Sequence, residues 1–251
     1  MRKILVAAAF VAFAAPAFGA SLFDETEKIS RTVAFEPGGT LRVKTFSGRV
    51  TITASDKNEV AVEAVRHASR DRLDRIKLDI HREGSTLVID TNHREYSWWD
   101  GMRNNVVETD LDIAVPRRTN LDLNTFSAAI TVDGVEGSSR VHGFSSRIQL
   151  NDITGSVRAH TFSGPVDIRS KNWQDQQSIT VDTFSGNIQL HVPENARGHV
   201  TFNSFSGRLN SEMPLTLHSS SRRNLSAELG GGADGSSLRF KTFSGSVRID
   251  R

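Results

Sequence analysis

Short stretches of alternating apolar and polar residues recur along the chain, each interrupted by the same tetrapeptide. Residues 41–53 read Leu-Arg-Val-Lys-Thr-Phe-Ser-Gly-Arg-Val-Thr-Ile-Thr, and residues 238–250 follow the same pattern. A period of two is typical of half-buried β-strands. The apolar positions lie five and three residues before the phenylalanine but four and six after it, so the inward phase changes inside the tetrapeptide. Because a phase change requires a bend or bulge, we expect the tetrapeptide to form a corner between two strands.

The tetrapeptide or a near-copy returns seven times, and its phenylalanines are spaced by 80, 18, 18, 22, 21 and 38 residues. The two long gaps are close to four and two times the short ones. A repeat of about 20 residues predicts an all-β fold, a single-chain β-solenoid (β-helix or β-roll) with about 18–22 residues per turn. About 11 turns would give a length of about 50 Å. The predicted corner residues are Phe46, Ser47, Gly48, Phe126, Ser127, Phe144, Ser145, Phe162, Ser163, Gly164, Phe184, Ser185, Gly186, Phe205, Ser206, Gly207, Phe243, Ser244 and Gly245.

Stacking of the corners at the usual strand spacing of about 4.8 Å would align the phenylalanines in an aromatic ladder and the serines in a hydroxyl ladder. We expect the phenylalanines to point inward. We expect the serines to bond backbone groups at the corners, since no histidine or acid recurs in step with them and no nucleophile motif surrounds them. The sequence therefore predicts no catalytic residue.

Residues 60–120 lack the tetrapeptide and are predicted to be less regular. Strand-like patterns cover residues 60–65, 76–80, 87–89 and 107–115, and Glu83-Gly84-Ser85 is typical of a hairpin turn. Residues 68–74 and 96–105 are predicted loops or short helical turns. The pattern fits either irregular turns of the solenoid or an attached hairpin.

The N-terminus carries the features of a secretory signal. Arg2 and Lys3 precede an apolar run over residues 4–18, and small residues at Ala17 and Gly19 suit cleavage near Gly19/Ala20. A membrane-spanning helix is the alternative, but it needs about 20 apolar residues. We therefore predict a signal peptide over residues 1–20 and one domain over residues 21–251. The chain has no cysteine, so neither a disulfide nor a lipidated cysteine is expected, and the localisation is predicted as periplasmic or secreted.

Charge argues against nucleic acid as a partner. Without Arg2 and Lys3 the formal charge of +2 falls to zero. The one basic-rich run, over residues 66–82, is interrupted by Asp71, Asp74 and Asp79, whereas phosphate binding needs clustered positive charge.

The repeated motif resembles that of the bacterial "putative adhesin" family, exported domains of unknown function that carry Thr-Val/Phe-Ser-Gly motifs between short strands. The likeness covers about residues 30–251. It includes the segment 35–40, the Val115-Pro116 step, Asn224-Leu225-Ser226 and the glycines 230–232. The resemblance implies a β-solenoid or β-roll in the bacterial envelope, and it implies no catalytic residues.

Two sets of polar side chains share outward rows in the predicted stack. His142 and His160 both lie two residues before their phenylalanines, within reach of one metal ion, but the other members of that row are Lys44, Asn124, Asp182, Asn203 and Lys241. We interpret this mixture as a polar face and predict no metal and no cofactor. Asp122, Arg140 and Arg158 lie four residues before their phenylalanines and are interpreted as a solvated face, with an ion-pair ladder or a sugar-acid contact as the alternatives.

Tyr96, Trp98 and Trp99 bring together two of the three tryptophans and the only tyrosine. Such a cluster either closes an open end of the solenoid or binds a sugar or protein partner.

These observations favour a non-enzymatic envelope protein, an adhesin-like scaffold or binding module that presents polar faces to protein or polysaccharide. A secreted polysaccharide lyase or hydrolase on a β-helix is one alternative, because fold alone does not decide function. A filament assembled through the solenoid ends is another. No stable membrane insertion is expected after signal cleavage.

Overall fold

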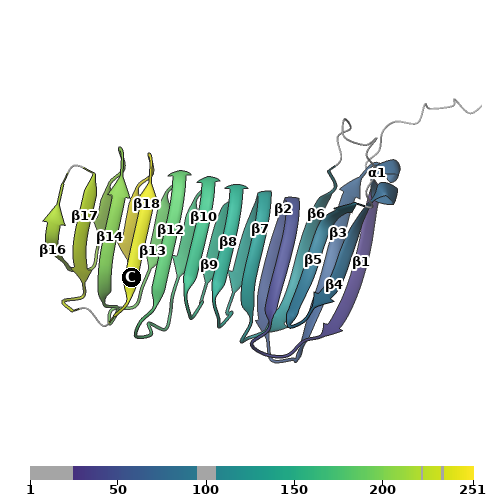
Figure 1. Cartoon of the computed structure of the whole chain (residues 1–251), viewed down its shortest axis with the longest axis horizontal. Helices are drawn as coiled ribbons and strands as arrows, with labels where there is room; N and C mark the ends of the chain where they lie inside the picture. The colour runs from purple at the N-terminus through teal and green to yellow at the C-terminus, as the bar shows by residue number, and fades with distance from the viewer. Residues whose placement is uncertain (1–24, 95–105, 222, 233–234) are drawn as a thin grey trace, which may run out of the picture.

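The described residues of the computed structural model are 25–94, 106–221, 223–232 and 235–251, and they form 19 β-strands and one short helix. The all-β prediction is confirmed. The strands stand side by side in one long row, with the N-terminal strands at one end and β16 at the other (Figure 1). In this part of the chain, no helix has the length and apolar character needed to cross a membrane.

Each motif-bearing segment makes one turn of the chain, with a strand before the corner and a strand after it. The strands before the corner form one face, in the stacking order β5 (Thr86–Arg94), β2 (Thr40–Ser55), β7 (Asn120–Asp133), β8 (Ser139–Ser145), β10 (Val157–Ser163), β12 (Ser178–Ser185), β18 (Ser237–Thr242) and β14 (Gly198–Ser204). The strands after the corner form the opposite face, in the order β6 (Glu108–Pro116), β2, β7, β9 (Arg147–Asn151), β11 (Val166–Arg169), β13 (Ile188–His191), β19 (Val247–Asp250) and β15 (Leu209–Ser211). The strands β2 and β7 pass through the corner without a break and contribute to both faces.

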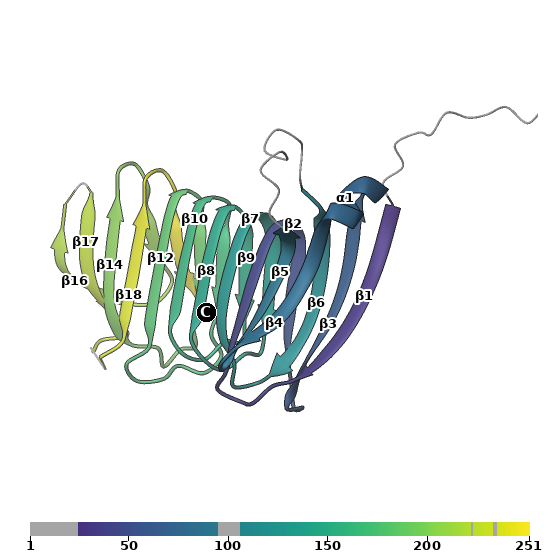
Figure 2. The ribbon, with the colours of Figure 1, turned by 45° about the vertical axis from the view of Figure 1, so that its right-hand side comes forward.

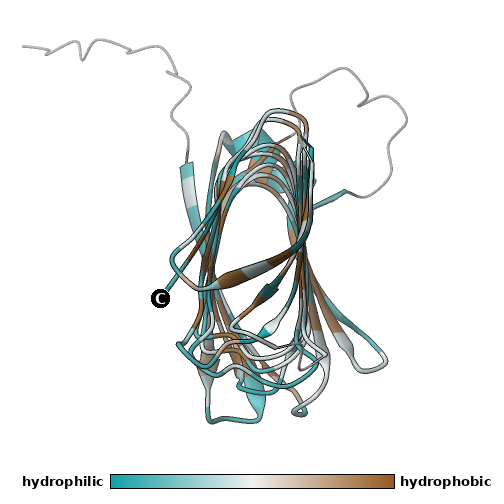
Figure 3. Cartoon of the chain, turned by 90° about the vertical axis from the view of Figure 1, so that its left-hand side faces the viewer, coloured by the Kyte–Doolittle hydropathy of each residue, from teal (hydrophilic) through white to brown (hydrophobic). Residues whose placement is uncertain are grey.

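Neighbouring turns pair in parallel and in register, so equivalent residues of the repeat lie next to one another. Leu41 is paired with Leu121, Val157 with Ile179, and Ile188 with Val247. The apolar side chains of both faces therefore form continuous rows inside a flattened tube, which Figure 3 shows from its end. Each fully buried valine, leucine or isoleucine stabilises such a core by about 1.5–3 kcal/mol.

The order of turns in space differs from their order in the sequence. Strands β18 and β19, the last of the chain, lie between the β12–β13 turn and the β14–β15 turn. The intervening residues form the antiparallel hairpin of β16 (Leu215–Ser220) and β17 (Asn224–Leu229), which extends the sheet beyond β14. The C-terminal turn is thus an interior turn of the stack.

Residues 59–116 combine both arrangements that the sequence left open. The predicted strand patterns correspond to β3 (Glu59–Ala68), β4 (Ile76–Glu83), β5 and β6, and the predicted helical turn corresponds to α1 (Arg70–Arg75). Strands β4 and β5 form an antiparallel hairpin, with Gly84 at φ 60° in its turn, while β5 and β6 add one parallel layer against β2. The first strand, β1 (Glu25–Ala34), pairs with β3 at this end (Figure 2). The two long spacings between tetrapeptides thus contain the strands at the two ends of the stack and one parallel layer. They hold fewer turns than their lengths predict.

Candidate binding site

Seven phenylalanine rings stack face to face along the corners. In stacking order the rings are Phe46, Phe126, Phe144, Phe162, Phe184, Phe243 and Phe205, with centroid distances of 4.6–5.0 Å and interplanar angles of 1–16°. The aromatic ladder is therefore present. The prediction that these side chains point inward was wrong, because each is 39–52% exposed. We call this set the phenylalanine ladder.

In five of the seven corners, the side chain of the residue before the phenylalanine takes the inward position instead. Thr45, Thr161, Thr183, Ser204 and Thr242 are all buried. The alternation of the first strand thus continues through the threonine, and the phase changes two residues later than an inward phenylalanine would require. Several of these hydroxyls bond the corner backbone: Thr161 Oγ1 donates to the Ser163 carbonyl at 2.9 Å, and Thr242 Oγ1 accepts from the Gly245 N–H at 2.8 Å.

The corner glycines bring successive turns into close backbone contact. A Cβ on Gly245 would lie 1.9 Å from the carbonyl oxygen of Gly186, and one on Gly207 would lie 1.9 Å from that of Gly245. Gly48 and Gly164 also have φ of 112° and 123°, conformations that L-residues rarely adopt. At Gly207 and Gly245 glycine is therefore needed chiefly because no space is left for a side chain, whereas Ala128 and Ser146 occupy the equivalent position in two other corners.

The corner serines lie just beyond the ladder, at the surface. Ser127, Ser145, Ser185, Ser206 and Ser244 are exposed, whereas Ser47 and Ser163 are half-buried. The hydroxyls of Ser145 and Ser163 are 3.2 Å apart on adjacent turns, and the Ser206 hydroxyl donates to the Phe243 carbonyl at 3.4 Å. The serines thus make occasional bonds along the corner, while the preceding threonines make the shorter bonds within it.

Two rows of polar side chains run parallel to the ladder on the same face. The near row, two residues before each phenylalanine, contains Lys44, Asn124, His142, His160, Asp182, Lys241 and Asn203 in stacking order. The far row, four residues before each phenylalanine, contains Arg42, Asp122, Arg140, Arg158, Thr180, Arg239 and Thr201. Asp122 forms a salt bridge with Arg42 at 3.0 Å. Within the described residues, Arg140, Arg158 and Arg239 form no salt bridge.

His142 and His160 are neighbours in the near row, with ring centroids 6.1 Å apart. Burial of the charged form lowers the pKa of His142, and the adjacent His160 lowers it further. Across the residues that the structure describes, no group of three or more histidines and acids is placed to hold a metal ion.

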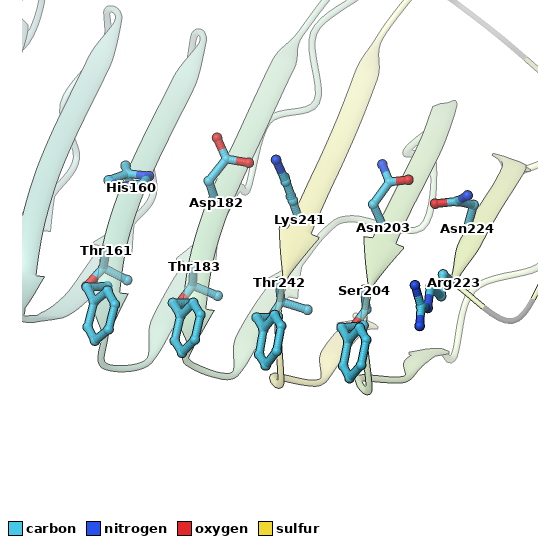
Figure 4. A pocket seen from close by; sticks show the side chains of 14 residues that line it. His160, Thr161, Asp182, Thr183, Asn203, Ser204, Arg223, Asn224, Lys241 and Thr242 are labelled. Atoms are coloured by element: carbon cyan, nitrogen blue, oxygen red, sulfur yellow. The ribbon is translucent and has the colours of Figure 1, made fainter.

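A groove with a volume of about 610 Å³ lies between the ladder and the near row at the C-terminal end of the stack. One wall is made by Phe162, Phe184, Phe243 and Phe205. The other wall is made by His160, Asp182, Lys241 and Asn203, which project from successive strands (Figure 4). Arg223 and Asn224 close the end, and the Arg223 guanidinium lies over the Phe205 ring at 4.5 Å from its centroid.

A charged cluster on the opposite face was not found from the sequence. His191 lies 2.5 Å from Asp250 and 3.7 Å from Asp167, and Asp250 also pairs with Arg248. These residues come from three turns brought together by the insertion of β19, an arrangement that the sequence order hides. The predicted aromatic cluster Tyr96, Trp98 and Trp99 lies outside the described residues, as does the predicted signal peptide over residues 1–20.

The chain is similar to solved structures from several bacteria. A protein of Clostridium sporogenes, described as a putative cell adhesion protein, is 10% identical with a TM-score of 0.48 over 89% of this chain and 99% of its own. Proteins described as putative adhesins from Parabacteroides distasonis and Bacteroides fragilis are 9% and 10% identical, with TM-scores of 0.33 and 0.32, and each match covers 89% of this chain and 97% of the other. The search of curated proteins gave no match.

A sequence family described as Toastrack DUF4097 matches residues 117–250, just over half of the chain. The matched region contains six of the seven tetrapeptides and their stacked corners. The chain therefore belongs to the Toastrack DUF4097 family.

Proposed function

We propose that this protein is a non-enzymatic binding module of the bacterial envelope, an adhesin-like β-solenoid whose phenylalanine ladder and adjoining polar rows form the binding surface. The proposal includes export by the signal peptide to the periplasm or the exterior. One observation carries it: seven large apolar side chains are each 39–52% exposed in one uninterrupted row. Contiguous exposed apolar patches on soluble proteins are typical of interaction sites.

The repetition of the surface also supports binding over catalysis. A reacting group needs one defined constellation of side chains, whereas the ladder offers the same edge at every turn. The near row changes its chemistry from turn to turn, from lysine through asparagine and histidine to aspartate. Such a surface is suited to an extended partner that contacts several turns at once.

Retention on isolated envelope material and on a panel of acidic and neutral polysaccharides tests this function. The mature protein is compared with a variant in which Phe126, Phe162 and Phe184 are replaced by serine, and with a Trp98→Ala/Trp99→Ala variant. We expect retention without depolymerisation, lost in the ladder variant and kept in the tryptophan variant, with both variants folded by circular dichroism. Depolymerisation of a polysaccharide would contradict the non-enzymatic proposal, and retention of a folded ladder variant would contradict the ladder as the surface.

End-to-end assembly is a second candidate, favoured by the outermost strand at the C-terminal end. In the described part of the chain β16 pairs with β17 alone, and its Leu217 is 56% exposed. An open strand edge without lysine or proline is a template for pairing with another chain. Light scattering against protein concentration, with a Leu217→Lys variant as control, distinguishes assembly from a monomeric module.

A further inference from the structure

The rings of the ladder offer their edges, not their faces, to a partner. Each interior ring is covered on both faces by its neighbours at 4.6–5.0 Å. The outer face of the last ring, Phe205, is covered by Arg223. Sugar rings and nucleic-acid bases pack against aromatic faces. The geometry therefore favours a partner that makes apolar contact along a row of edges.

The groove is the part of the ladder where such a partner would be enclosed on two sides. The three ring spacings between Phe162 and Phe205, of 4.7–4.9 Å, extend it over about 14 Å. One acyl chain spans half of the hydrocarbon core of a bilayer, which is about 15 Å. The volume of about 610 Å³ lies within the range of small-molecule sites.

The floor of the groove offers few free polar groups. It is formed by Thr161, Thr183, Thr242 and Ser204. The hydroxyls of Thr161, Thr242 and Ser204 already bond the backbone of their own corners, at 2.6–2.9 Å. A hydrocarbon chain on this floor would therefore displace little hydrogen bonding.

The walls and the adjoining far row favour a negative head group. Lys241 and Arg223 line the groove, and no acidic side chain of the described residues forms a salt bridge with either. Arg158 and Arg239 belong to the far row. They lie two residues before His160 and Lys241 on the same strands, and thus about 7 Å from these two residues of the groove wall. Asp182 is the one acid among the lining residues.

Charge also argues against a second copy of this chain as the occupant. A symmetric dimer joined through the groove would place the same patch on both sides, so cations would face cations. An anionic partner instead interacts favourably with each of these cationic side chains.

We infer that the groove at the C-terminal end of the ladder binds the acyl chain of an anionic amphiphile, with the chain along the ring edges of Phe162, Phe184, Phe243 and Phe205 and the head group at Lys241 and Arg223. This inference rests on the proposed function and names the ligand class of the same surface.

Calorimetric titration with dodecanoate, below the concentration at which it forms micelles, tests the inference. Dodecyl maltoside has the same chain and no charge, and we expect it to bind at least about tenfold more weakly than dodecanoate. Replacing Phe184 and Phe243 by serine should weaken dodecanoate binding at least about tenfold. The matched control replaces Phe46 and Phe126, an adjacent stacked pair outside the groove, by serine; it should leave dodecanoate binding unchanged while weakening retention on the envelope, because both residues belong to the ladder. Lys241→Glu should weaken dodecanoate binding, whereas Lys44→Glu, in the same row but outside the groove, should leave dodecanoate binding unchanged.

Vesicles of phosphatidylglycerol and of phosphatidylcholine distinguish the binding of a single acyl chain from binding to a membrane surface. If the protein bound phosphatidylglycerol vesicles but not dodecanoate, and if replacing either phenylalanine pair abolished that binding equally, the groove site would be overturned. The whole phenylalanine ladder would then be the membrane-binding surface. No dodecanoate binding, with envelope retention still dependent on the ladder, would overturn the inference and leave the proposed function standing. Should the groove variants fail to fold, NMR shifts of the Thr183 and Thr242 methyl groups in the parent protein decide: dodecanoate should move them and leave Thr125 unmoved, and the absence of shifts at the groove would overturn the site.

Discussion

The rings of Phe184 and Phe243 lie face to face, with centroids 4.7 Å apart and planes within 5°, although 59 residues separate them in the sequence. Phe205, which follows Phe184 directly in the repeat, stacks instead on the far side of Phe243 at 4.8 Å. The last turn of the chain is thus inserted between two turns that precede it. Packing of the β12–β13 and β14–β15 turns therefore depends on a turn that comes later in the sequence than both.

Deleting residues 237–251 should remove an interior turn and not an end turn. The β12–β13 turn would lose its partner on one side, and the β14–β15 turn would lose its only parallel neighbour among the described strands. We expect limited proteolysis to cut residues 178–229 rapidly in the truncated protein while residues 40–169 stay protected. Equal protection of both regions would contradict the inserted order of turns.

Gly245→Ala should be strongly destabilising. The added Cβ would lie 1.9 Å from the carbonyl oxygen of Gly186 and 2.8 Å from the Thr242 hydroxyl, which leaves it no room. We expect a loss of about 3 kcal/mol in the free energy of unfolding, measured by urea titration. Gly232→Ala is the control, because a Cβ there meets nothing within 4 Å. A loss of similar size in both variants would argue against close corner packing.

The ladder should stabilise the fold through ring stacking as well as through burial. Among the described residues, Phe144 stacks on two rings and is 47% exposed, whereas Phe46 stacks on one and is 39% exposed. Burial alone predicts the larger loss for Phe46→Ala. Stacking predicts the larger loss for Phe144→Ala, about 1–3 kcal/mol from its two aromatic pairs. Chemical unfolding of the two variants decides which effect dominates.

The lowered pKa of His142 makes stability depend on pH. Burial disfavours the protonated imidazole in the folded protein, while the unfolded chain takes up the proton at its ordinary pKa of about 6.5. This part of the stability is therefore present above about pH 6.5 and is lost as the pH falls through the folded pKa. His142→Asn, which introduces the residue found at Asn124 in the same row, should reduce the fall in melting temperature between about pH 7.5 and pH 5.5. An unchanged fall would mean that other groups account for it.

The alternation of apolar residues was sufficient to predict the strands on either side of the corners and the corners themselves, because burial on one face fixes a period of two. It did not predict β1, β16 or β17. It did not predict the direction of the phenylalanines. Thr45 and its equivalents are small enough to stay inside a tight corner, and the sequence pattern alone does not show that the phase changes after the phenylalanine. The positions of β18 and β19 were also not predicted, since identical repeats carry no record of which neighbour each one pairs with. The groove depends on both features, so it could not be predicted either.

Photo-crosslinking at the ladder tests the central claim most directly. A benzoyl derivative of phenylalanine is placed at position 184 and, as a control, at Gln149, a half-buried polar residue of β9 on the opposite face. After export and irradiation in bacteria, the account predicts covalent adducts with envelope material at position 184 and none at position 149. Adducts at position 149 alone, or at neither position, would contradict the ladder as the binding surface.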